Sequence, residues 1–261
     1  MPSRNLWTED ELKVTLSLYF QLPFGRLNHT TREVRELAAL IGRTENSVAL
    51  RLVNFAAVDP YIIASGRRGM VGGEKICRPL MEQYYSPEMR EQLYIEAEAI
   101  KARIQKKTID QRLGIRETDL IGTTREALVK YRVNQDVFRT IVLNNYENTC
   151  AVTGITIPEL LIAIHIIPWA ADEPNRLNPE NGICLSPLYD RAFDKGFITV
   201  DANDYTIILS KQLKEYRQQA FYKEHFARVE RQKLLFPDNI EHRPNPAFLE
   251  YHRDFIFSGR D

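Results

Sequence analysis

The stretch AIHIIPWAADEPNRLNPENGICLSPLYDRAFDKG, residues 163–196, decides how the C-terminal half of this chain folds. An apolar, β-branched run that ends at His165 predicts a strand, and a polar loop follows it. Asn181 and Gly182 mark a turn before a second short apolar run. Pro187 is typical of the first position of a helix. The residues therefore predict the order strand, loop, strand, helix.

Polar side chains stand at fixed places in this order. His165 ends the first strand, and Asn181 comes just before the second. Asp190 and Asp194 lie four residues apart and share one face of the predicted helix. Each residue also has a plainer explanation, since Asn181 fits an ordinary turn, Asp194 fits a helix end, and single histidines are often structural. Taken together in this order, they favour a metal site.

The composition sets limits on the class of protein. The chain has 261 residues, 44% hydrophobic and 27% charged, as expected for a globular protein with one large domain or two small ones. It has no apolar run near the roughly 18 residues of a membrane helix, and its N-terminus lacks the apolar core of a signal peptide. Its three cysteines, Cys77, Cys150 and Cys184, lie far apart. This pattern argues against a disulfide framework and for a cytoplasmic protein.

The formal net charge is zero, which weakens the simplest argument for a nucleic-acid partner. A local basic patch stays open as an alternative. Between Arg43 and Arg78 the chain carries six Lys or Arg residues against three Asp or Glu residues.

The N-terminal third predicts a set of short helices. Thr8 is a good N-cap for the first of them. Residues 32–41 form a second amphipathic segment that Gly42 is well placed to end, and Thr44 opens a third helix. Two short helices joined by a tight turn describe a helix-turn-helix, in which the second helix enters the major groove of DNA.

The outward side of that second helix carries residue types that read base edges. The following SGRRGMVGGEK segment combines glycines, which allow close approach to a phosphate, with two arginines. A plain helical hairpin and a solvated turn are the alternatives. The predicted DNA-binding residues are Arg43, Asn46, Ser47, Arg51, Arg67 and Arg68.

The middle of the chain predicts a long helix in SPEMREQLYIEAEAIKARIQKK, residues 86–107, which Ser86 can cap, followed by a weakly patterned stretch. A narrow apolar stripe along this helix fits either a connector or the seam of a homodimer. After residue 200 we expect a strand in DYTIILS, one charged helix over residues 211–233, and a closing helix in NPAFLEYHRDFIF. His225, His242 and His252 receive no role. The stripe consists of Met89, Leu93, Ala97, Ile100 and Ile104.

The motifs HIIPW, NG sixteen residues after His165, and LYDRAFDKG resemble the HNH nuclease superfamily with its ββα-metal fold, above all a restriction-type branch. The segments LPFGR and LIGRTENSVALRLVNFAAVDP resemble the helix-turn-helix half of bacterial HNH proteins. The resemblance implies an α+β protein with three parts. Residues 1–86 would form a helix-turn-helix-like DNA-binding domain, residues 87–124 a helical connector, and residues 125–261 the HNH domain with its core at 146–200.

The resemblance also implies roles for the site residues. His165 would act as the general base, and Asn181 would fix the site geometry by hydrogen bonds across the loop. Asp190 and Asp194 would hold a divalent ion, with Mg²⁺ or Mn²⁺ favoured by their hard oxygen ligands. The candidates for phosphate binding are Arg176, Arg191 and Lys195.

The implied function is a metal-dependent endonuclease of restriction or defence type that acts on double-stranded DNA. We expect the protein in the bacterial cytoplasm and expect no association with a membrane. The alternative is a DNA-binding, regulatory protein with an HNH domain that does not cut. RNA processing fits less well, because no aromatic RNA-binding platform is visible. The chain departs from many relatives at two places. Tyr189 and Asp190 fill the slot where they have a histidine, and Ile164 precedes the first His where others have a polar residue.

Overall fold

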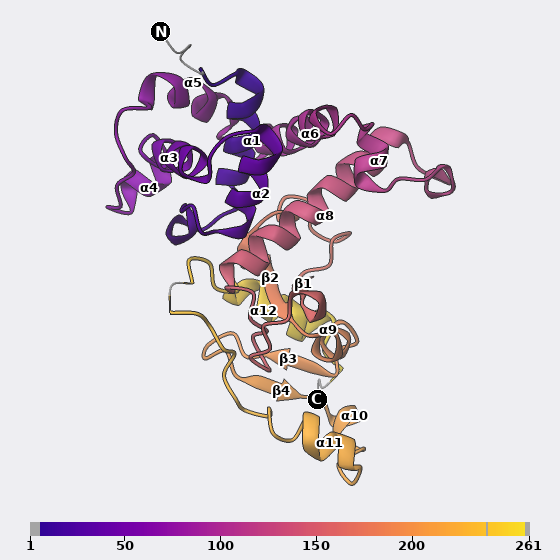
Figure 1. Ribbon diagram of the computed structural model, residues 1–261. Coiled ribbons are helices and arrows are strands. Elements are labelled where there is room, and N and C mark those ends of the chain that lie inside the picture. Colours follow the sequence, from indigo (N-terminus) through magenta and orange to yellow (C-terminus); the bar gives the residue numbers. More distant parts are fainter. Residues whose placement is uncertain (1–5, 239, 259–261) are drawn as a thin grey trace. The chain divides into compact units, whose positions relative to one another are not determined.

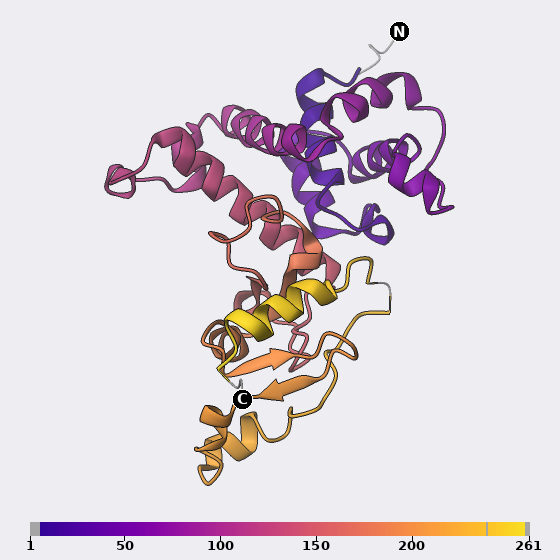
Figure 2. The same cartoon turned by 180° about the vertical axis from the view of Figure 1, so that it is seen from behind.

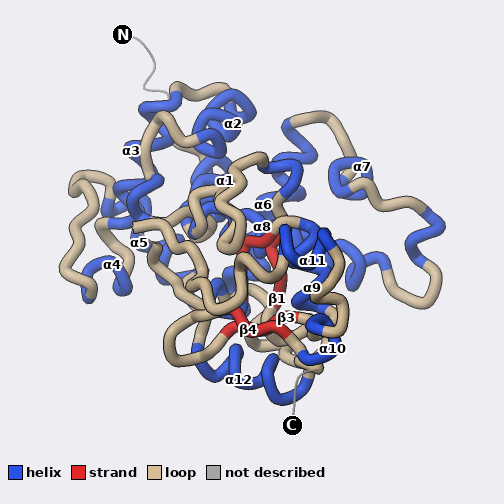
Figure 3. The backbone as a smooth tube through the Cα atoms, turned by 90° about the horizontal axis from the view of Figure 1, so that it is seen from below, coloured by secondary structure: helices blue, strands red, loops and turns tan. Residues whose placement is uncertain are grey.

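The computed structural model of the protein describes residues 6–238 and 240–258, and its fold is α+β. Helices dominate, and the four short strands stand out as small red segments (Figure 3). The chain divides into two compact units, Met1–Val137 and Phe138–Asp261. The division falls inside one long helix, α8 (Arg125–Asn145). None of the helices in the described ranges is long and apolar enough to cross a membrane.

The first unit is helical and begins as its sequence predicts. Thr8 caps the first helix in a capping box with Glu11, and Thr44 caps the third helix by accepting a hydrogen bond from the Ser47 amide. Gly42 ends the second helix in a left-handed conformation, which costs a glycine nothing. Before α8, this unit contains α1 (Glu9–Tyr19), η1 (Phe24–Arg26), α2 (Arg32–Ile41), α3 (Glu45–Ala56), α4 (Pro60–Ala64), α5 (Glu74–Tyr84), α6 (Pro87–Ile104), α7 (Ile109–Leu113) and η2 (Glu117–Leu120).

The core of this unit is built by α1, α2, α3, α5 and α6, which pack against one another. Val48, Leu52 and Phe55 of α3 are fully buried in it, as the apolar spacing of that helix predicts. The predicted pair of helices joined by a tight turn is therefore present. Whether it binds DNA stays a prediction.

The apolar stripe of α6 belongs to the same core. Leu93, Ala97 and Ile100 are buried, and α6 packs against α1 and α5 (Figure 1). The middle of the stripe is thus already covered inside its own unit, while Ile104 at its end is exposed, so the three buried residues are not free to form the dimer seam considered above. The functional boundaries at residues 86 and 124 stay a prediction.

The second unit holds two separate antiparallel hairpins, β1 with β2 and β3 with β4. Helix α9 packs against β1, β2 and β3, and the C-terminal helix α12, yellow in Figure 2, lies against β3. After α8, the elements are η3 (Pro158–Leu160), β1 (Ile162–His165), η4 (Pro179–Asn181), β2 (Gly182–Leu185), α9 (Pro187–Asp194), β3 (Ile198–Val200), β4 (Ile207–Leu209), α10 (Lys211–Lys214), α11 (Ala220–His225) and α12 (Pro246–Phe255).

The single helix expected over residues 211–233 is wrong. Two short helices, α10 and α11, occupy this segment with turns between and after them. Leu213 and Tyr222 are both buried in the core of the second unit. Nine residues at roughly 100° each would place them on opposite sides of one helix, so the chain breaks to bring both inward.

His252, to which the sequence analysis gives no role, fastens α12 to the rest of the second unit. Its ring is buried and stacks on Phe193, with 3.6 Å between ring centroids. Its Nδ1 lies 2.8 Å from the Thr199 hydroxyl, and its Nε2 donates to the Phe193 carbonyl at 3.1 Å. Burial lowers the pKa of this imidazole to about 4, so it is neutral at pH 7.

Candidate active site

The first hairpin brings His165 and Asn181 to the same end. In the register of β1 and β2, His165 pairs with Gly182, so Asn181 stands directly beside this pair. The Ile166 amide extends the ladder by donating to the Asn181 carbonyl at 2.9 Å. Helix α9 packs against both strands and completes a ββα arrangement (Figure 1).

The His165 ring is held on three sides. It stacks on Phe138 of α8 with centroids 3.6 Å apart and planes inclined by 13°. Trp169 meets it edge-on at 5.3 Å. Its Nε2 lies 2.9 Å from the Arg176 carbonyl oxygen. A carbonyl only accepts, so Nε2 carries the proton and Nδ1 keeps its lone pair.

The protonation state suits a base. Burial lowers the pKa of His165, and the hydrogen bond to the Arg176 carbonyl opposes this shift. The nearby guanidinium of Arg176 adds a smaller lowering. The imidazole is therefore neutral at pH 7, with its lone pair on Nδ1.

Asn181 is fully committed to the loop between the strands. Its side chain is buried, Oδ1 accepts from the Ile167 amide at 2.8 Å, and Nδ2 donates to the Ile167 carbonyl at 3.2 Å. A further bond from Nδ2 reaches the Asn175 carbonyl at 3.3 Å. These bonds fix the chain just after His165 and engage both ends of the amide with backbone groups. The part of Asn181 in catalysis stays a prediction.

The loop itself is ordered by asparagine side chains. Asn175 donates to the Asp172 carboxylate at 2.7 Å, and Asn178 donates to the Asn175 side chain at 2.9 Å. Arg176 follows this turn, which places its carbonyl in reach of His165. Gly182 is required where the hairpin meets α8, because an added Cβ would lie 2.4 Å from Val142.

The two predicted metal ligands of α9 differ. Asp190 is half-buried, and no described residue hydrogen-bonds or ion-pairs with its carboxylate. Burial and the neighbouring Asp194 raise its pKa, and Arg191 opposes the shift. Asp194 is exposed and forms ion pairs with Arg191 at 3.4 Å and Lys195 at 3.7 Å. Asp190 is thus the better donor for a cation.

The departures from the family pattern point into the core. Tyr189 is buried, and its hydroxyl donates to the His225 carbonyl. Ile164 is buried on the face of β1 opposite to His165. Ile164 has no donor atom, and the Tyr189 hydroxyl is engaged by the His225 carbonyl, so neither position offers a metal ligand here.

The predicted phosphate-binding residues keep local partners. Arg176 donates from Nε to the Trp169 carbonyl at 3.0 Å, pairs with Glu173 at 3.2 Å, and lies 5.0 Å over the Trp169 ring. Arg191 and Lys195 are exposed and both pair with Asp194, and such surface pairs are weak enough to exchange for a phosphate.

The protein side chains at this site could supply only a few of the ligands of a divalent ion, so water and substrate would have to supply the others. Within residues 6–238 and 240–258, no group of three or more His, Cys, Asp or Glu side chains is placed to hold a metal ion. Helix α9 offers the half-buried carboxylate of Asp190 and, one turn later, the exposed carboxylate of Asp194. Mg²⁺ commonly keeps several waters and binds through one or two carboxylates together with substrate phosphates. The residues are compatible with that mode.

The predicted DNA-binding residues of the first unit divide into two groups. Arg43 does not face outward, because its guanidinium pairs with Glu11 at 2.7 Å, donates to the Leu6 carbonyl at 2.8 Å and covers the Trp7 ring at 4.3 Å. The prediction that Arg43 lies on the exposed face is wrong, because the fold brings Glu11, 32 residues earlier in the chain, against its guanidinium.

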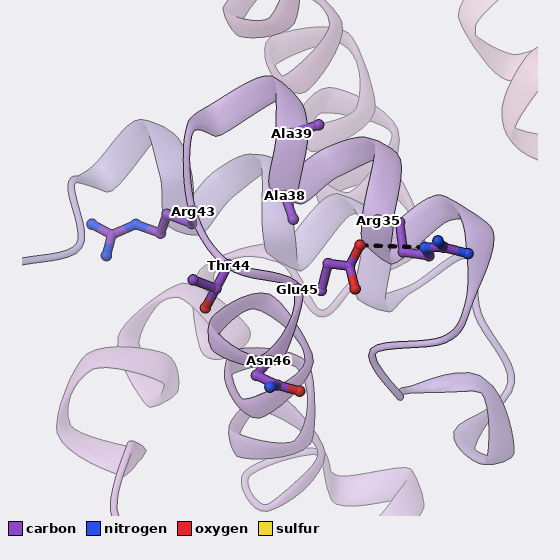
Figure 4. Close-up of a pocket in the computed structure, with 7 residues that line it drawn as sticks. All are labelled: Arg35, Ala38, Ala39, Arg43, Thr44, Glu45 and Asn46. Atoms are coloured by element: carbon purple, nitrogen blue, oxygen red, sulfur yellow. Dashed lines mark hydrogen bonds and ion pairs between the residues drawn. The ribbon is translucent and has the colours of Figure 1, made fainter.

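The remaining residues are more accessible. Asn46 and Arg68 are exposed, and Ser47, Arg51 and Arg67 are half-exposed. A hollow of about 380 Å³ lies at the start of α3, with the Arg35–Glu45 ion pair on one side (Figure 4). Arg43 extends away from that pair.

Phe138 is the site residue that sequence reasoning missed. It stacks on His165, yet it belongs to the apolar face of a helix that ends well before the motif. Arg139 beside it donates to the Leu161 and Pro158 carbonyls at 2.7 and 3.2 Å and so ties α8 to the start of β1. The helical spacing of α8 shows that Phe138 is apolar and inward, but not that a histidine lies above it.

Comparison with known families agrees with this geometry. Residues 150–201 match the family model of the HNH endonucleases, and this segment contains β1, β2, α9 and β3. The second unit therefore contains a domain of the HNH superfamily. At the level of the family, the match indicates nuclease chemistry on DNA, and HNH nucleases generally use a divalent metal ion. None of the curated proteins matches the chain.

Proposed function

We propose that this protein is a metal-dependent DNA endonuclease of restriction or defence type in which His165 is the general base. The observation that carries the proposal is the fixed tautomer of His165. Its Nε2 donates to the Arg176 carbonyl at 2.9 Å, which leaves Nδ1 with a lone pair at the end of β1.

In the proposed reaction, His165 Nδ1 accepts a proton from the water that attacks phosphorus. One P–O bond forms to the water oxygen, and the P–O bond to the leaving sugar oxygen breaks. The stack on Phe138 and the hydrogen bond of Nε2 keep the ring from turning, so the lone pair points in one direction. A divalent ion, when bound, would polarise the phosphate and stabilise the leaving oxygen.

Asp190 would hold this ion, because its half-buried carboxylate has no protein partner among the described residues. Arg191 and Lys195 would neutralise the phosphate backbone, with Asp194 as their partner when DNA is absent. Asn181 would position the loop. The same proposal places the protein in the bacterial cytoplasm with duplex DNA as its substrate.

The test is cleavage of supercoiled plasmid by the full chain with Mg²⁺, with Mn²⁺, or with EDTA. We expect nicked or linear product with at least one of the two metals and none with EDTA. A folded protein that binds duplex DNA but gives no product with either metal would instead be the non-cutting regulator, and the proposal would be wrong.

The metal ligand is tested by calorimetric titration of the full chain with Mn²⁺. Asp190→Asn should weaken binding at least tenfold, and Asp194→Asn, one helical turn away, serves as the matched control with little effect. Equal heats for wild type and Asp190→Asn would remove Asp190 from the metal site.

A further inference from the structure

The glycine-rich loop of residues 65–73 joins α4 to α5 and is fixed against the C-terminal half of α3. The Met70 amide donates to the Val53 carbonyl at 3.1 Å. The buried Asn54 side chain donates from Nδ2 to the Met70 carbonyl at 2.7 Å. The loop is thus anchored to α3 through the backbone of Met70.

Gly69 shows how closely the loop approaches the helix. An added Cβ would lie 2.2 Å from the Ala57 amide nitrogen and 2.4 Å from the Val53 carbonyl oxygen. Both neighbours are backbone atoms of α3 and its C-cap, so neither moves aside easily. Only glycine fits at this position, so the close packing of the loop on α3 is a specific feature of the first unit.

The loop presents apolar side chains to solvent. Met70 is 55% exposed and Val71 is 73% exposed. The surroundings are basic, since residues 61–78 contain four Lys or Arg residues and one acidic residue, Glu74. An exposed apolar pair within a basic segment is unusual on an ordinary solvated turn.

The exposed side of α3 leads into this loop. Asn46 and Leu50 lie on the same side of the helix as Asn54, at a spacing of four residues. Asn46 is exposed and Leu50 is 47% exposed. Asn54 holds the loop through Met70. The surface that begins at Asn46 therefore continues into Met70.

We propose that residues 67–71, which we name the basic loop, make a second contact with duplex DNA beside α3. Arg68 would neutralise a phosphate, and Met70 with Val71 would pack against the sugars and base edges of a groove. The inference rests on the proposed function, since it assumes a protein that acts on DNA. The excess of positive charge favours a polyanion as the occupant, because Lys and Arg side chains neutralise backbone phosphates. Apolar side chains are used in this way by proteins that bind the minor groove.

The test is fluorescence anisotropy of the full chain with a labelled random duplex in EDTA, which prevents cleavage, at several salt concentrations. The double variant Met70→Ser, Val71→Ser should weaken binding about tenfold through the loss of partly buried apolar area. It should leave the salt dependence unchanged. Arg68→Ala should flatten the slope of log K against log salt by about one.

Two further variants sharpen the result. Ile121→Ser removes a side chain that is 86% exposed in the same unit and serves as the control, with no expected effect. Gly69→Ala keeps every charge and apolar side chain but displaces the loop, so it should also weaken binding. If Gly69→Ala fails to fold by circular dichroism, the Met70, Val71 and Arg68 variants still decide the question.

The outcomes separate this inference from the proposed function. Wild type that cuts plasmid while the loop variants bind DNA as tightly as wild type would overturn the inference alone. Wild type that neither binds nor cuts any duplex would overturn both. If the variants bind DNA normally but lose self-association in size-exclusion chromatography, the surface is a protein interface and the inference is wrong.

Discussion

Replacing Asn181 by aspartate tests whether the loop after His165 depends on this one amide. The substitution keeps the shape of the side chain and keeps an oxygen for the Ile167 amide, which Oδ1 now accepts at 2.8 Å. It removes both donor functions of Nδ2. The carbonyls of Ile167 and Asn175, now 3.2 and 3.3 Å from Nδ2, would then face a buried carboxylate oxygen.

The magnitude follows from these two contacts. A buried polar group left without its partner costs about 1–3 kcal/mol. Both bonds are long, at 3.2 and 3.3 Å, so we take a cost in the lower half of this range for each of them. Their sum gives an expected loss of about 3 kcal/mol in the free energy of unfolding at pH 7. Acidification should reduce the loss, because a protonated carboxyl regains one O–H donor.

The assay is urea unfolding followed by tryptophan fluorescence. The chain has two tryptophans, and Trp169 lies in the loop itself, so a Trp7→Phe background leaves a signal from the second unit only. Gln218→Glu, an exposed amide-to-acid change in the same unit, is the control for the added charge. A loss for Asn181→Asp within about 0.5 kcal/mol of that control, the size of an ordinary surface substitution, would refute the role of Asn181 in holding the loop.

Three further outcomes are expected. Because burial lowers the pKa of His165, the acid limb of a plot of kcat/KM against pH should report an apparent pKa below the value of about 6.5 for a free histidine. An apparent pKa above that value would contradict the observed environment. The pKa of His252 is about 4 in the folded chain and about 6.5 in the unfolded chain, so the unfolded chain binds the proton first as the pH falls. The free energy of unfolding of the second unit should therefore decrease by about 3 kcal/mol between pH 6.5 and pH 4. Above pH 6.5 this histidine should contribute no pH dependence. Urea midpoints measured across this pH range would check it, and a His252→Gln variant should lack that part of the dependence. Arg43→Ala should destabilise the first unit by about 2 kcal/mol, since it leaves the largely buried Glu11 unpaired, whereas Arg68→Ala should change thermal stability little.

The sequence predicts those features of the structure that depend on residues close together in the chain. Thr8, Gly42 and Thr44 mark helix ends because caps act within three or four residues. His165 ends one strand of the hairpin and Asn181 precedes the other, so pairing of the two strands places both residues at the same end. The HNH motif is visible in the sequence for the same reason, since it lies within one hairpin and one helix.

Contacts between distant residues were not predictable. Arg43 fits an outward arginine at the start of a recognition helix, until the fold brings Glu11 beneath it. Phe138 meets His165 from another element, and no spacing links the two. The break after α10 depends on a core that both Leu213 and Tyr222 must reach, which a charged segment does not reveal by its own periodicity.

The central claim is that His165 is the base of a DNA-cutting site, and cleavage by a single variant tests it most directly. His165→Ala and the control His29→Ala, an exposed histidine of the first unit, should both fold and bind duplex DNA like wild type. Under single-turnover conditions with Mn²⁺, we expect plasmid cleavage to persist in His29→Ala and to fall by at least about a hundredfold in His165→Ala, as for the loss of a general base. Cleavage by His165→Ala at the wild-type rate would contradict the account.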